Sequence, residues 1–199
     1  MPSELLVLNA QPVIVPDVKS HDETDLIAVV KSDKLIPFTV KDVVGNIRIK
    51  GNLQDRVVKS KTTGHLHFAQ RIILENVASS EQDAICITGV TRINFPASKK
   101  YWVGWRPDGL GHVQPYDSSW CDGGLAYPGV FISFSFYDID PYSTVKDTGC
   151  MSRMSKFYYI KTESNDFDHY GFTYLHPKPL NAGIELEPDP VLQTARPIY

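Results

Sequence analysis

The chain of 199 residues lacks an excess of basic residues, with 20 Lys and Arg against 23 Asp and Glu and a net charge of −3. Proteins that hold nucleic acid through its phosphates need clustered Lys and Arg, so this balance argues against a nucleic-acid partner. No apolar run approaches the roughly 18 residues of a membrane-spanning helix. The first residues show neither the basic segment nor the apolar core of a signal peptide. We therefore expect a soluble, cytoplasmic protein with no membrane span.

Cysteine is scarce, and there is no C-x-x-C pair. The three cysteines, Cys86, Cys121 and Cys150, are widely spaced. An odd number does not fit a complete disulfide framework. We expect three free thiols in a reducing compartment, with Cys86 as an inert residue of an apolar run.

Several motifs of known chemistry are also missing. The sequence has no G-x-S-x-G, no phosphate-binding Walker loop, no G-x-G-x-x-G and no H-E-x-x-H. The sequence therefore predicts no cofactor and names no catalytic residue, and whether the protein is an enzyme stays open.

Short β-rich runs dominate what is present. The clearest is 129–137, in which Val130, Ile132 and Phe134 alternate with Ser133 and Ser135. Further candidates are 13–15, 26–30, 38–40, 47–50, 71–77, 84–90, 156–161 and 170–174. Only 22–30 fits a helix, and its β-branched residues fit a strand equally well. With 14 prolines and 13 glycines between the runs, the pattern predicts an all-β antiparallel sandwich or jelly roll.

The two ends differ from the middle in their proline content. Residues 1–20 carry three prolines and residues 176–199 carry five. Because proline cannot donate to a β-ladder, we expect both ends to be extended arms lying on a surface. The predicted division is an N-terminal arm at 1–20, one domain at 21–175 and a C-terminal arm at 176–199.

All three tryptophans fall between residues 101 and 120. Aromatic rings interleaved with Arg and Asp suit the binding of a sugar or of a protein partner. A place in the core is the alternative. Trp102 and Trp105 are at odd spacing, so they cannot share one face of a regular strand. The candidate binding residues are Trp102, Trp105, Arg106, Asp108, Tyr116, Trp120 and Asp122.

A second candidate site consists of histidines. His65-Leu-His67 places two imidazoles on one face of a strand, the spacing that a metal needs. Together with the turn Pro107-Asp-Gly-Leu-Gly-His112, it resembles the two signature motifs of the cupin family. The resemblance implies a jelly-roll barrel in which His65, His67 and His112 hold one divalent transition metal, as in dioxygenases and isomerases. Where the family pattern has a glutamate, this chain has Arg71 and Ile72.

The leading hypothesis is a non-catalytic protein. It binds a ligand, possibly carbohydrate or another small molecule, or it assembles through the aromatic stretch and its arms. The expected partners are copies of itself in a homo-oligomer, another assembly partner, or a glycan. The alternative hypothesis is the cupin-like metal-dependent enzyme.

Overall fold

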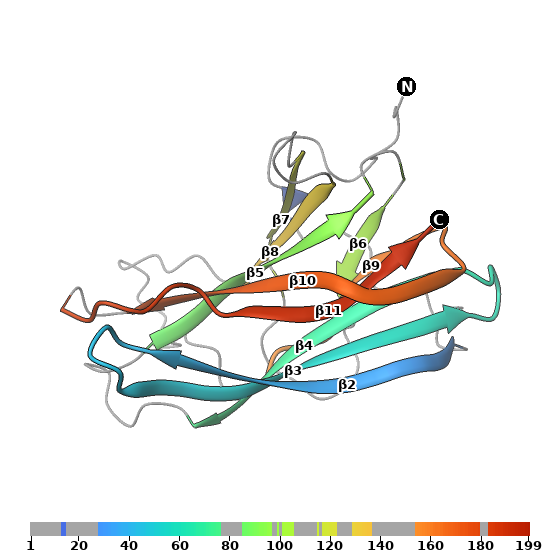
Figure 1. The fold of residues 1–199 in the computed structure, drawn as a ribbon. Coiled ribbons are helices and arrows are strands. Elements are labelled where there is room, and N and C mark those ends of the chain that lie inside the picture. The colour runs from blue at the N-terminus through green and yellow to red at the C-terminus, as the bar shows by residue number, and fades with distance from the viewer. Residues whose placement is uncertain are drawn as a thin grey trace.

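The computed structural model describes residues 13–14, 28–76, 85–96, 99, 101–105, 115, 117–122, 129–136, 154–179 and 183–199. These residues form two antiparallel sheets that face each other, which confirms the predicted all-β sandwich class (Figure 1). The part of the candidate helix that is described, residues 28–30, belongs to a strand. Among the residues that the structure describes, none forms a helix long enough and apolar enough to span a membrane.

One sheet has six strands in the order β1-β7-β8-β5-β10-β11. Their bounds are β1 Val13–Ile14, β5 Ile85–Phe95, β7 Asp117–Asp122, β8 Val130–Ser135, β10 Asp166–Pro179 and β11 Val191–Ile198. The other sheet has five strands in the order β2-β3-β4-β9-β6. Its strands are β2 Ala28–Lys41, β3 Ile47–Ser60, β4 Leu66–Asn76, β6 Trp102–Trp105 and β9 Tyr158–Lys161.

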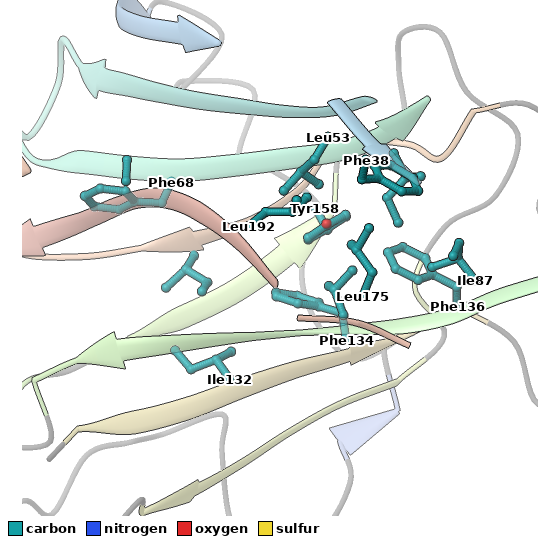
Figure 2. Close-up of a cluster of buried hydrophobic side chains, with 14 of the residues drawn as sticks. Phe38, Leu53, Phe68, Ile87, Ile132, Phe134, Phe136, Tyr158, Leu175 and Leu192 are labelled. Carbon is teal, nitrogen blue, oxygen red and sulfur yellow. The ribbon is translucent and has the colours of Figure 1, made fainter. Parts of the chain in front are cut away.

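In β8 the alternation of apolar and polar residues decides which face of the strand enters the core. In β8 the residues Val130, Ile132 and Phe134 are buried, while the intervening positions are half-buried. Apolar side chains from both sheets meet in this interior (Figure 2). The ring of Tyr158 from the five-stranded sheet lies 4.9 Å from that of Phe134, measured between centroids. The predicted two-faced character of 129–137 is therefore confirmed within β8.

The core also encloses an ion pair that joins the sheets. Arg92 of β5 and Asp55 of β3 lie 3.5 Å apart, from Nη2 to Oδ1, with side chains 1% and 2% exposed. Arg92 donates hydrogen bonds to the carbonyls of Phe68 (3.1 Å) and Ala195 (2.8 Å). Asp55 accepts from the Ala195 amide (2.7 Å) and from Gln70 Nε2 (2.9 Å). β11 is thereby tied to both members of the pair.

Within the predicted C-terminal arm 176–199, the strand residues 176–179 and 191–198 are hydrogen-bonded into the sheet rather than laid over a surface. Residues 176–179 continue β10, and β11 is the edge strand beside it. The pairing of β10 with β11 ends at Tyr174, so residues 175–179 of β10 pair with β5 alone. Pro177 and Pro179 are tolerated because one side of the strand needs no ladder hydrogen bond at these positions. Of the predicted N-terminal arm, Val13 and Ile14 pair with β7 as β1, and the rest lies outside the described residues.

The cysteines differ from the expectation of three free thiols. Cys121 is free and exposed. Cys86 is buried, as predicted, but it is disulfide-bonded, so the prediction is wrong at this position. Its partner lies outside the described residues. Spacing along the chain does not reveal which cysteines the fold brings together, and this is why the sequence pattern misled.

Candidate ligand-binding site

Three adjacent strands, β8, β5 and β10, build the candidate site on the face of their sheet that points away from the core. Val90, Ile132 and Leu175 turn inward and are fully buried. The neighbouring positions in each strand turn outward because successive side chains alternate. Thr91 is opposite Ser133 on β8 and opposite Tyr174 on β10.

These outward side chains form an open pocket of about 270 Å³, lined by Thr91, Ile93, Phe131, Tyr174 and His176. Ile93 is 5% exposed but does not belong to the hydrophobic core between the sheets. Its side chain is therefore covered by residues on the outer face of the sheet, where the pocket lies. Three of the five lining residues are apolar or aromatic. A concave apolar surface with a few converging polar groups is the usual form of a small-molecule site.

A continuous chain of hydrogen bonds supplies the polar side of the pocket. Asp189 Oδ2 lies 2.7 Å from His176 Nδ1. His176 Nε2 lies 2.7 Å from Thr91 Oγ1, which lies 2.8 Å from Ser133 Oγ. Each hydroxyl can both donate and accept, so the direction of the chain follows the tautomer of the imidazole. The site can therefore offer either a donor or an acceptor to a bound hydroxyl group.

Thr88 and Gly89 of β5 contact the two neighbouring strands closely at this point. His176 is opposite Gly89, and a Cβ atom at Gly89 would lie 2.8 Å from the carbonyl oxygen of Phe134 and 3.6 Å from His176 Cδ2. Glycine at this position therefore permits the close approach of the Phe134 carbonyl on β8, whereas the distance to His176 is an ordinary van der Waals contact. The hydroxyl of Thr88 also donates to the carbonyl of His176 (3.0 Å), which fixes the backbone of β10 at this point.

Asp189 is held in place by its neighbours in the chain. It stands between Pro188 and Pro190, and proline restricts both its own φ angle and the residue before it. The carbonyl of Pro190 accepts a hydrogen bond from the Leu175 amide (3.0 Å). The carboxylate is thereby presented to His176 by a restrained segment, although its side chain is 43% exposed.

The order of carboxylate, imidazole and hydroxyl is also that of acyl-transfer triads. Such enzymes further need N–H donors aimed at the developing oxyanion. Thr91 lies in the middle of β5, which pairs with β8 on one side and β10 on the other. The backbone at Thr91 is therefore part of two ladders.

The aromatic stretch predicted as a binding surface is divided between the sheets. Trp102 and Trp105 lie on β6 of the five-stranded sheet, whereas Trp120 and Asp122 lie on β7 of the six-stranded sheet. Trp105 packs against the core, and Lys156 Nζ lies 5.1 Å from the centroid of its ring. Arg106, Asp108 and Tyr116 lie outside the described residues, so the predicted platform stays a prediction.

The predicted metal ligands are described only in part. His65 precedes β4 and is half-buried, while His67 is 4% exposed and opposite both Val58 and Lys161. His112 lies outside the described residues. Within the ranges that the structure describes, no three His, Cys, Asp or Glu side chains gather closely enough to hold a metal ion. The cupin-like three-histidine site stays a prediction.

Sequence reasoning missed the pocket residues. Thr91 and His176, for example, are 85 positions apart in the chain. One signal was present: Ser133 was predicted to face away from the core.

No protein-family model matches this chain, and neither a curated protein nor a solved structure matches it.

Proposed function

We propose that the protein binds a small polyhydroxylated ligand, such as one sugar unit of a glycan, in the pocket between β8, β5 and β10. The observation that carries the proposal is the hydrogen-bonded chain from Asp189 to Ser133 along one side of an aromatic pocket. A sugar ring has an apolar C–H face and a rim of hydroxyls, which match an aromatic wall beside paired donors and acceptors.

The dimensions support a ligand of this size. The pocket volume of about 270 Å³ lies just under the range of roughly 300–1,000 Å³ that holds drug-sized molecules. It therefore suits a single ring with its substituents. The residues with the largest roles are Tyr174 and Phe131 for stacking, and Thr91 and His176 for hydrogen bonding.

The proposal is tested by titrating the protein with a panel of monosaccharides and oligosaccharides, using calorimetry. For a sugar that binds, Thr91→Val keeps the shape of the side chain but removes its hydroxyl, so we expect binding to weaken by roughly tenfold. Tyr174→Ala removes an aromatic wall and should weaken it at least as much.

The matched control is Tyr170→Ala on the same strand. Tyr170 is 65% exposed and does not line the pocket, so binding should change by less than about twofold. If no sugar binds, or if Tyr170→Ala weakens binding as much as Tyr174→Ala does, the proposed function is wrong.

A further inference from the structure

A second cluster lies on the other sheet, on the face that points away from the core. Arg56 of β3 and Arg71 of β4 both contact the ring of Phe157, which precedes β9. The guanidinium carbons lie 4.7 and 4.6 Å from the ring centroid. We call Arg56 and Arg71 the arginine pair. Two cations over one aromatic ring form a concentrated positive site.

One chain of hydrogen bonds holds the arginine pair in place. Asp33 Oδ2 accepts from Arg56 Nη2 (2.6 Å) and Nε (3.1 Å). Asp33 Oδ1 accepts from Gln54 Nε2 (2.7 Å), and Gln54 Oε1 accepts from Arg71 Nε (2.6 Å). Strand register supports the chain, because Asp33 is opposite Arg56 and Gln54 is opposite Arg71. These side chains are therefore ordered before a ligand binds, which lowers the entropic cost of binding.

The cluster has two positive charges and a single carboxylate to balance them. Within the described part of the chain, the terminal Nη groups of Arg71 donate no hydrogen bond. Burial lowers the pKa of Arg71, and the nearby charge of Arg56 lowers it further, while Asp33 acts in the opposite direction. An added anion would relieve this repulsion and would accept hydrogen bonds from the terminal N–H groups of Arg71.

We propose that the arginine pair is a binding site for a carboxylate group, held by the terminal N–H groups of Arg71 beside Phe157. A guanidinium presents two parallel N–H donors that match the two oxygens of a carboxylate. One uncompensated positive charge matches a monoanion, whereas a phosphate dianion would leave an excess of negative charge. The site is on a different sheet from the sugar pocket and does not depend on the proposed function.

The test follows the ¹⁵Nε–H resonance of Arg71 while sodium acetate replaces sodium chloride at constant ionic strength. We expect a saturable shift of this resonance. Arg71→Gln, followed through the amide signals of β3 and β4, should weaken acetate binding by roughly tenfold or more. Lys50→Gln removes the same charge from an exposed position on β3 and should change the affinity by less than about twofold.

Gln54→Met provides a second variant that keeps every charge and removes the partner of Arg71 Nε. We expect it to weaken acetate binding because Arg71, although present, is no longer held by this hydrogen bond, so the variant serves if Arg71→Gln does not fold. A shift that is linear in acetate, or equal affinity in Arg71→Gln, Gln54→Met and the unaltered chain, would overturn the proposal. Saturable binding of inorganic phosphate with no binding of acetate would overturn the assignment to carboxylates.

Discussion

Arg92 and Asp55 lie 3.5 Å apart in the interior of the sandwich, and each side chain comes from a different sheet. Burial lowers the pKa of Arg92, while the charge of Asp55 opposes this effect. Both side chains also bond to Ala195 of β11. The pair therefore connects three strands across the core and fixes the C-terminal edge strand in its register.

Removing one member of this pair leaves the other charge buried without compensation. We expect Arg92→Met or Asp55→Asn to lower the free energy of unfolding by about 3–5 kcal/mol. Arg196→Met is the comparison, because Arg196 and Asp168 form a partly exposed pair of the kind that contributes about 0–1 kcal/mol. Urea unfolding measures all three variants, and equal losses for Arg92→Met and Arg196→Met would contradict the prediction.

Packing between the sheets predicts a second contrast in stability. Leu175 is fully buried among the core residues shown in Figure 2, so Leu175→Ala should lower the free energy of unfolding by about 2–5 kcal/mol. Leu35 is 60% exposed on the edge strand β2, and Leu35→Ala should cost less than about 0.5 kcal/mol. Thermal or urea unfolding distinguishes them, and a larger loss at Leu35 would show that the core is placed wrongly.

Acid should destabilise the protein in part through Asp168. Burial raises the pKa of Asp168, but hydrogen bonds from Arg196 and the Tyr170 amide outweigh this effect and hold the pKa below its ordinary value. A lowered folded-state pKa adds stability above the unfolded value of about 3.9, and this stability disappears as the pH falls through the folded value.

Asp168→Asn should therefore reduce stability at pH 7 and make the loss of stability below about pH 4 less steep. Urea midpoints measured at neutral and acid pH for both proteins provide the test. An unchanged acid dependence in Asp168→Asn would show that the ion pair with Arg196 contributes nothing.

The disulfide at Cys86 predicts the number of reactive thiols. Under non-reducing conditions the denatured chain should show one reactive thiol, that of Cys121, whereas after reduction all three cysteines should react. A thiol-specific reagent with absorbance detection counts them. Three reactive thiols before reduction would mean that the bond does not form.

The strands were predictable where one face of a sheet enters the core. In 129–137 the alternation is unbroken, and it places Val130, Ile132 and Phe134 inside. The prolines of 176–199 led to the prediction of an arm outside the sheet, because no local pattern reveals that a strand is unpaired on one side. Buried charges such as Arg92 and Asp55 carry no signal in a single sequence, since Arg and Asp are ordinary surface residues.

The candidate site was less predictable than the fold. Its polar groups come from three strands and from the segment before β11. They become neighbours only through the strand order β8-β5-β10, which the sequence pattern does not specify. Tryptophan is rare, so three tryptophans within residues 101–120 indicate a candidate site, whereas threonine and serine on a strand are too common to do so.

The most direct test of the proposed function is to map the residues that respond to a bound sugar by ¹H–¹⁵N spectroscopy. Saturable shifts should centre on Thr91, Ser133, Tyr174 and His176, with small changes on β6 and β7. Shifts centred on Trp102, Trp105 and Trp120 would place the ligand on the tryptophan stretch and contradict the pocket as the binding site.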